Sequence, residues 1–142
     1  MNKAIDNLIN AQNFAMSIRP KVGGFPYLAE TLRAAGVTRN VWYLPSCQSV
    51  YLTRFGAVVQ QGTPLISGTS EVLKFNQDIL ILALRTDQAG KSSFPEFLKS
   101  AWEAGVVSYD VEFENRRVTY YGVFGEAYVE EYPLVEIKKS GI

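Results

Sequence analysis

At 142 residues, with 47% hydrophobic and 20% charged residues, the chain is long enough to bury a substantial core and is expected to fold as one domain. Fourteen basic and fourteen acidic residues cancel, so no overall field attracts polyanions or anionic membranes, which argues against nonspecific nucleic-acid binding. The longest apolar run, residues 79–84, is far shorter than the roughly 20 residues of a membrane span. Asp6 and Asn7 interrupt the apolar start that a signal peptide needs. We therefore expect a cytoplasmic protein without a membrane partner.

Two helices are expected at the start of the chain. Over residues 3–17, apolar side chains recur at helical spacing. The same spacing returns from Phe25 onward, and this second helix ends at Gly36, because glycine adopts the left-handed conformation that closes a helix at little cost.

A three-stranded meander should follow these helices. Its first strand points Trp42 inward and Tyr43 away from the core, and strand phase points Tyr121 of the second half away from the core as well. A short turn at residues 45–48 leads to a second strand that carries Tyr51. A glycine then turns the chain into a third strand at residues 57–61, which ends before a proline, a residue that cannot donate to a sheet.

The second half begins with a helix over residues 76–88, with Asn76 as its cap. Taken alone, residues 79–84 are also compatible with a buried strand. The next helix has a capping-box pattern, since Ser93 is followed three residues later by Glu96, and it ends at Gly105 as the second helix ends at Gly36. This half also predicts three strands: residues 106–113 with strict alternation, a strand that carries Tyr120, and residues 126–132.

The two halves are similar in sequence. A shift of 69 positions aligns residues 25–65 with 94–134 without a gap and gives about ten identities. Self-similarity at a fixed period indicates a duplicated unit. We expect an α+β fold in which a helix-helix-three-strand module occurs twice, at about residues 1–69 and 70–138, as two pseudo-symmetric halves that share one sheet or form two.

The chemistry available to the chain is limited by the absence of histidine, which excludes Ser–His and Cys–His nucleophiles and imidazole metal sites. We expect no metal and no cofactor. The single cysteine, Cys47, lies in an expected turn without a neighbouring charge and is interpreted as an inert thiol. Asp110 and Glu112 share one strand face, and a solvated face is favoured over an acid/base pair.

Aromatic residues are the main candidates for a binding site, because tyrosine and tryptophan combine a rigid apolar ring with a polar group. Core packing is the competing use for most of them, including Tyr109 and Tyr128. Arg116, in the expected turn at residues 114–117, is also a candidate because an arginine can contact a phosphate or carboxylate. The candidate ligand- or partner-binding residues are Trp42, Tyr43, Tyr51, Tyr120, Tyr121 and Arg116. No catalytic residue is assigned.

Residues 84–122 and 25–52 resemble a family of small uncharacterised enterobacterial and prophage-associated proteins, often labelled phage envelope protein. The most specific parts are residues 94–95, 104–106 and 118–122. The resemblance covers almost the whole chain. It implies a prophage origin and an α+β fold, and it transfers no catalytic residues.

These observations favour a small cytoplasmic binding or regulatory protein of prophage origin, whose partner is an unidentified protein or small molecule. One alternative is an enzyme without histidine, with its site at the seam between the repeats. The other is a homo-oligomer that pairs through strand edges.

Overall fold

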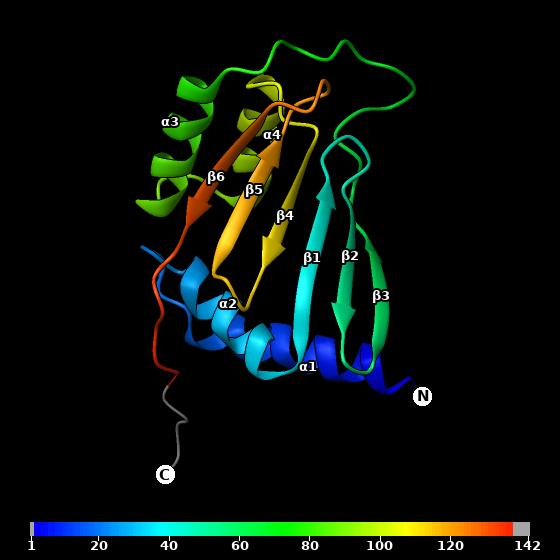
Figure 1. The fold of residues 1–142 in the computed structure, drawn as a ribbon, viewed down its shortest axis with the longest axis vertical. Coiled ribbons are helices and arrows are strands. Elements are labelled where there is room, and N and C mark those ends of the chain that lie inside the picture. The colour runs from blue at the N-terminus through cyan, green and yellow to red at the C-terminus, as the bar shows by residue number, and fades with distance from the viewer. Residues whose placement is uncertain (1, 138–142) are drawn as a thin grey trace.

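The structure is a computed structural model that describes residues 2–137. Within that range it contains four helices and a six-stranded antiparallel sheet (Figure 1). The helices are α1 (Lys3–Ile18), α2 (Phe25–Ala34), α3 (Gln77–Gln88) and α4 (Phe94–Glu103). The strands are β1 (Val37–Tyr43), β2 (Gln48–Thr53), β3 (Gly56–Gln61), β4 (Ser108–Glu112), β5 (Arg117–Tyr121) and β6 (Ala127–Glu131). The expected α+β fold, with its module repeated, is confirmed.

The first helix of each module is capped in the same way. In α1 the Asn2 side chain accepts a hydrogen bond from the Ile5 N–H (3.2 Å), and in α3 the Asn76 side chain accepts one from the Ile79 N–H (3.0 Å). Each bond satisfies one of the backbone donors that a helix start leaves free. The cap at Asn76 confirms the helix over this segment and excludes the alternative strand.

The second helix of each module ends as the sequence predicted. Gly36 and Gly105 follow α2 and α4 with φ angles of 93° and 86°. At the start of α4, Ser93 and Glu96 form both hydrogen bonds of the capping box.

All six strands belong to one sheet, in the order β3-β2-β1-β4-β5-β6. This order settles whether the two halves share a sheet, because β1 of the first module pairs directly with β4 of the second. Val41 lies opposite Asp110 in this pair, and the two residues are also equivalent under the shift of 69. An approximate twofold axis therefore passes between them.

The first hairpin turn is conserved in shape between the modules. Cys47 and Arg116 are equivalent under the same shift, and both have a φ of 51°. They are the non-glycine residues with positive φ in the described range. Two unrelated side chains therefore adopt one left-handed conformation because the turn requires it.

The last strand of the second module departs from the ungapped alignment. Tyr51 pairs with Val58 across β2 and β3, whereas its counterpart Tyr120 pairs with Tyr128 across β5 and β6. The shift is thus 70 in β6, because the hairpin before it is one residue longer. The expected end of the second repeat, residue 138, lies outside the described residues.

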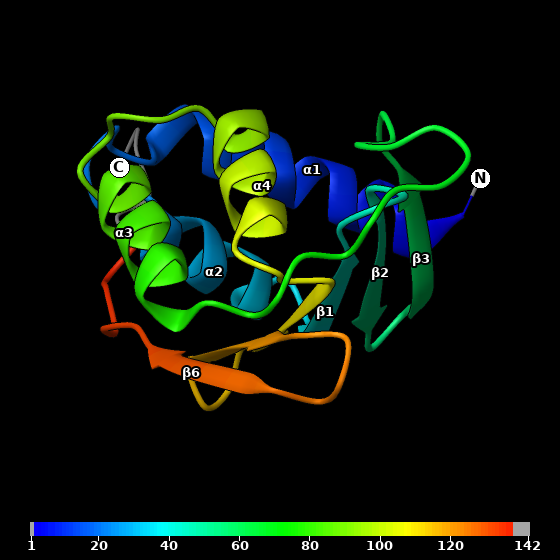
Figure 2. The same ribbon diagram turned by 90° about the horizontal axis from the view of Figure 1, so that it is seen from above.

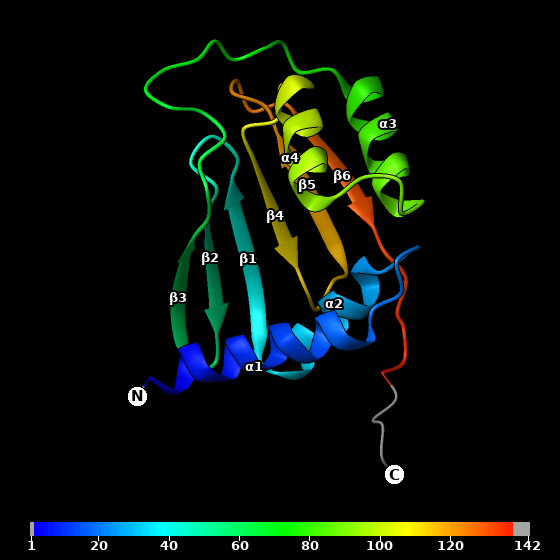
Figure 3. The same cartoon turned by 180° about the vertical axis from the view of Figure 1, so that it is seen from behind.

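The four helices lie on one side of the sheet (Figure 2). In Figure 3, α1 and α2 cross the end of the sheet where β1 begins, whereas α3 and α4 lie over β4, β5 and β6. The core between these layers includes the fully buried side chains Leu8, Leu44, Leu80, Val37, Val106 and Val111. Truncating one of these leucines to alanine should cost about 2–5 kcal/mol. Within residues 2–137, no helix has the length and apolar character needed to cross a membrane.

Candidate functional site

A row of polar and aromatic side chains crosses the whole sheet on the side that faces the helices. The strand registers place one residue from each strand in this row, which we name the aromatic row. In sheet order its members are Gln60, Ser49, Trp42, Tyr109, Tyr120 and Tyr128. The sheet thus brings together residues that are up to 86 positions apart, counted from Trp42 to Tyr128.

The rings in this row pack against one another. Trp42 stacks on Tyr109 with a centroid distance of 6.1 Å and an interplanar angle of 15°. Tyr109 and Tyr120 follow at 5.6 Å, and Tyr120 and Tyr128 at 6.5 Å. Trp42 also contacts Phe94 of α4, with a centroid distance of 5.2 Å in a T-shaped arrangement. Each such pair contributes about 0.5–1.5 kcal/mol beyond area burial, so the row stabilises the β1–β4 junction.

The cavity of the site lies at the Trp42 end of this row. It has a volume of about 430 Å³ and is lined by Trp42, Ser49, Gln60, Gln61 and Gly62. We name it the Trp42 pocket. It lies where β1 and β3 end and β2 begins, with Gln12 of α1 hydrogen-bonded to Gln60 on one side and Phe94 of α4 against Trp42 on the other. Its lining side chains are amide, hydroxyl and indole groups, without a charged residue.

Hydrogen bonds hold one wall of the Trp42 pocket in place. Gln60 of β3 and Gln12 of α1 exchange two side-chain hydrogen bonds, with N–O distances of 2.9 and 3.0 Å. Tyr51 lies beside this pair. Burial raises the pKa of the Tyr51 hydroxyl, and hydrogen bonding with Ser49, Gln12 and Trp42 offsets part of that shift. The wall is therefore built from neutral groups whose positions are fixed by one another.

The opposite end of the aromatic row is charged. Glu130 of β6 accepts hydrogen bonds from Arg85 (2.8 Å), Gln88 (2.7 Å) and the Tyr128 hydroxyl (2.9 Å). Burial raises the pKa of Glu130, but these three donors outweigh it and the pKa is lower than usual. The three groups that donate to Glu130 lie on α3 and β6, so this cluster links α3 to the edge strand β6.

A second acidic group lies near the middle of the row. Asp87, at the end of α3, is half-buried, and burial raises its pKa despite the Ser92 hydroxyl and the charge of Arg19. Burial also raises the pKa values of Tyr109 and Tyr120, and the Asp87 charge adds to both shifts. The two hydroxyls therefore stay protonated at neutral pH.

The structure separates the six candidate residues into three places. Trp42, Tyr51 and Tyr120 face the helices, and the two tyrosines are buried core residues. Tyr43 and Tyr121 point to the other face of the sheet, as their strand positions predicted. Arg116 lies in the β4–β5 turn. The hydrogen bond from Arg33 lowers the pKa of Glu30, and the charge of Arg116 adds a smaller lowering. Burial raises the pKa of Tyr132 to about 12 against the opposing charge of Arg116.

The expectation of a solvated carboxylate face is wrong for Asp110. Only 7% of this residue is exposed. The Arg39 guanidinium lies over it and donates through Nε to both carboxylate oxygens, at 2.8 and 2.9 Å, and through Nη2 as well. The ion pair joins β1 to β4 and thus links the two modules. It is a structural contact between repeats.

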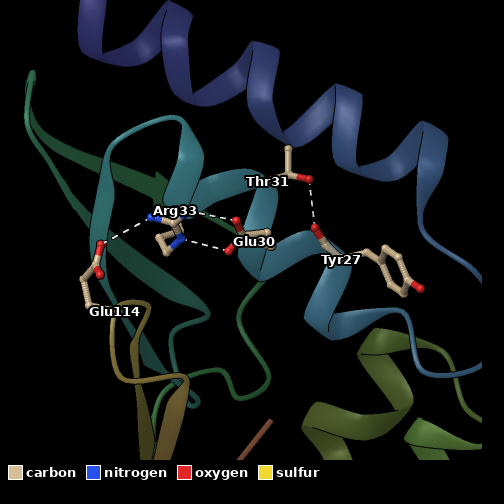
Figure 4. Close-up of polar contacts among 5 residues, drawn as sticks. All are labelled: Tyr27, Glu30, Thr31, Arg33 and Glu114. Atoms are coloured by element: carbon tan, nitrogen blue, oxygen red, sulfur yellow. Dashed lines mark hydrogen bonds and ion pairs between the residues drawn. The ribbon is translucent and has the colours of Figure 1, made fainter. Parts of the chain in front are cut away.

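A polar cluster on α2 has a similar structural role (Figure 4). The Arg33 guanidinium donates two hydrogen bonds of 2.8 Å to Glu30 and approaches Glu114 of the β4–β5 turn at 3.5 Å. On the same helix the Thr31 hydroxyl donates to the Tyr27 carbonyl at 2.8 Å. The hydrogen bonds to Glu30 and Tyr27 lie within α2, and the approach of Arg33 to Glu114 links the helix to the second module.

A larger hollow of about 1130 Å³ lies between α1, α2 and residues 134–137. Its wall ends at Ile137, next to residues that the structure does not describe, and it contains none of the six candidate residues. We assign no site to it. Among the described residues, no cluster of three acidic or cysteine side chains is arranged to hold a metal ion.

Sequence reasoning missed Gln12, Ser49 and Gln60 as site residues. Ser49 and Tyr51 share a strand face, so alternation places Ser49 on the inner side once Tyr51 is assigned there. Gln12 and Gln60 carry no such signal, because their pairing depends on how α1 crosses β3.

Comparisons with known proteins agree with one another. The family model described as "Protein of unknown function (DUF1398)" matches residues 12–131. The chain is also 52% identical to uncharacterized protein Mb2035 of Mycobacterium bovis and to uncharacterized protein Rv2012 of Mycobacterium tuberculosis strain H37Rv. Each match extends over 136 residues, which is 96% of this chain and 83% of the relative. The chain therefore belongs to the DUF1398 family.

Proposed function

We propose that this protein is a small cytoplasmic binding protein, of prophage origin as its sequence resemblance implies, that holds an uncharged planar small molecule in the Trp42 pocket. The observation that carries the proposal is the lining of that pocket. One aromatic ring, one hydroxyl and two amides converge there, and no charged side chain does. Pockets that combine an aromatic wall with a few fixed polar groups are typical small-molecule sites.

The lining indicates the chemical class of the ligand. A carboxylate or ammonium group bound there would give up part of its hydration without gaining a counter-charge, because no charged side chain lines the pocket. An amide or a neutral heteroaromatic N–H group could instead stack on Trp42 and donate to Oε1 of Gln61, whose amide nitrogen already donates to the Ser46 and Gly62 carbonyls. It could also use the hydrogen-bonding capacity that the pair with Gln12 leaves on Gln60. The amides both donate and accept, so they suit a ligand that has both kinds of group.

The size of the cavity supports a small ligand. A volume of about 430 Å³ lies within the range of small-molecule sites, roughly 300–1,000 Å³. A single-ring fragment that fills part of it should bind with a Kd of about 0.1–1 mM, because fragments of this size gain only about 4–6 kcal/mol.

The pKa shifts at the seam support binding over an enzymatic role. Burial keeps the hydroxyls of Tyr109 and Tyr120 protonated, which suits hydrogen-bond donation and not proton abstraction at neutral pH. Asp87 is the acidic group that an enzyme at this seam would use, since its pKa is raised. Asp87 is not one of the residues that line the Trp42 pocket.

The proposal is tested with three ring compounds that differ in charge: benzamide, benzoate and benzylamine. Ligand-observed NMR with the wild-type protein should detect benzamide binding and little or no binding of the two charged analogues. Gln60→Ala should weaken benzamide binding at least about tenfold, since it removes a lining amide with a hydrogen bond.

The matched control is Gln12→Ala. It breaks the same pair of hydrogen bonds but removes a side chain that does not line the pocket. It should therefore cost less affinity than Gln60→Ala. Equal binding of the three compounds, or equal loss in the two variants, would contradict a neutral site at Trp42.

A further inference from the structure

The side of the sheet that faces away from the helices contributes one residue to the lining of the Trp42 pocket, Gln61, which shares a row with Gln48 and Tyr43. Strand alternation places three rows of side chains on this side of the sheet, and no helix within residues 2–137 covers it (Figure 2). We name it the open face. Its middle row, in sheet order, is Val59, Val50, Val41, Asp110, Thr119 and Val129. An antiparallel sheet commonly leaves one face to solvent, and the side chains on that face are then mainly polar.

The half of the open face that belongs to the first module is apolar. Val59 is 58% exposed, Leu52 41% and Tyr43 45%. Val50 and Val41 lie between them and are half-buried by their neighbours. Exposed apolar residues that are contiguous in this way mark an interaction surface.

The charges on the open face lie in one outer row, apart from Asp110 in the middle row. That outer row contains Arg39, Glu112, Arg117 and Glu131, and the remaining charge, Asp110, is covered by Arg39. Two arginines against three carboxylates give the face a net charge of −1. The other outer row, which includes Tyr43 and Tyr121, has no charged residue.

We propose that the open face is where two copies of this chain meet, as a face-to-face dimer whose twofold axis runs across the strands along the middle row. Rotation about this axis places the charged row of one copy on the uncharged row of the other. Arg39 and Arg117 then face Tyr43 and Tyr121 of the second copy, where cation–π contacts form. The apolar part of the middle row packs on itself, as an isologous interface requires.

This charge arrangement favours a second copy over a nucleic acid. Exposed tyrosines on an open sheet can stack bases, but a face with a net charge of −1 repels phosphates. In the dimer, Asp110 of one copy faces Asp110 of the other, which is the one place where two like charges meet. Each carboxylate is paired with Arg39 of its own chain, which offsets the repulsion.

The size of the open face is sufficient for a dimer. Six strands at about 4.8 Å spacing and five residues at about 3.3 Å each give a flat area of roughly 500 Å². Because side chains project from the sheet, the accessible surface of this face is larger than its flat area and approaches the ~800 Å² that each partner contributes to a standard interface. Aligned sheets of this kind pack about 10 Å apart with their strands within about 30°.

Sedimentation equilibrium from about 1 μM to about 1 mM tests the proposal. The wild-type chain should dimerise, and Leu52→Lys and Val59→Lys should each raise the dimer Kd at least about tenfold, because a lysine would be buried without a counter-charge. Leu82→Lys is the matched control. Leu82 is 67% exposed on α3, on the helix side, and its substitution should leave the Kd unchanged. Circular dichroism shows that each variant is folded.

A cross-link locates the interface independently of these variants. In a Cys47→Ser background, Val59→Cys places one thiol on the middle row at an edge strand. Facing sheets are too far apart for a direct disulfide, so a bismaleimide that spans about 10 Å is used. It should give a covalent dimer with Val59→Cys and not with Leu82→Cys.

A wild-type chain that stays monomeric to about 1 mM overturns the proposal. So does a dimer that the open-face lysines leave intact, or one that cross-links equally through Leu82→Cys. Protection of the free backbone amides of β3 or β6 on dimerisation would show pairing through strand edges instead, and a shift with single-stranded DNA would show a nucleic-acid surface.

Discussion

Replacing Gly105 with alanine should destabilise the protein more than the same change at Gly36, although the two glycines are equivalent in the repeat. Both have positive φ, so each alanine has a left-handed cost of about 1–2 kcal/mol. At Gly105 the new Cβ would lie 2.6 Å from the backbone N and Cα of Phe75 and 2.7 Å from the Leu73 carbonyl oxygen. At Gly36 the contacts of 2.8–2.9 Å are with the side chain of Arg54, which is exposed and can rotate away.

We therefore expect Gly36→Ala to cost about 1–2 kcal/mol. Displacing backbone adds about 1–3 kcal/mol, so Gly105→Ala should cost at least about 1 kcal/mol more. Urea denaturation followed by circular dichroism measures both values on the same chain. The 2.8 Å hydrogen bond from the Asn76 N–H to the Ala104 carbonyl holds residues 73–75 against the end of α4. Losses of unfolding free energy that are equal within about 0.5 kcal/mol in the two variants would contradict this packing.

Three further substitutions test the electrostatics and the thiol. Glu130→Gln should lower the melting temperature at pH 7, and the difference should vanish as the pH falls through the carboxylate range, because the folded pKa of Glu130 is lowered and its stabilisation is lost on protonation. Asp87→Asn should raise the melting temperature at pH 7 and have less effect near pH 4, because the folded pKa of Asp87 is raised and the charged form destabilises the fold; a melting temperature that is lower at both pH values would refute this sign. Cys47→Ser should lower the free energy of unfolding, measured by urea denaturation, by only about 1 kcal/mol, because the serine hydroxyl can donate to the Leu44 carbonyl as the thiol does. Burial raises the pKa of the Cys47 thiol, so the native protein should not react with a thiol reagent until it unfolds.

Much of the local structure could be predicted because it depends on residues close in sequence. The cap at Asn76 and the helix end at Gly105 are set by a few neighbouring residues, and both were predicted. Strand alternation placed Trp42 inward and Tyr43 outward in the same way. The repeat added the equivalence of the modules, which no single segment reveals.

The contacts between modules could not be predicted in the same way. Asp110 was expected to be solvated, because nothing near it in sequence is a partner; Arg39 is 71 positions away and is brought beside it by the β1–β4 pairing. The Gln12–Gln60 pair depends on how a helix crosses an edge strand. Such contacts follow from topology, and an alignment of two halves does not specify how the halves join.

The Trp42 pocket is tested most directly by the two tryptophan indole N–H signals of the ¹⁵N-labelled protein. The chain has two tryptophans, and Trp102 on α4 does not line the pocket, so its signal is an internal control. Trp102→Phe assigns the two peaks. On titration with benzamide to about 10 mM, we expect a saturable shift of the Trp42 signal and an unchanged Trp102 signal. An unmoved Trp42 signal, or a shift confined to Trp102, would contradict this expectation.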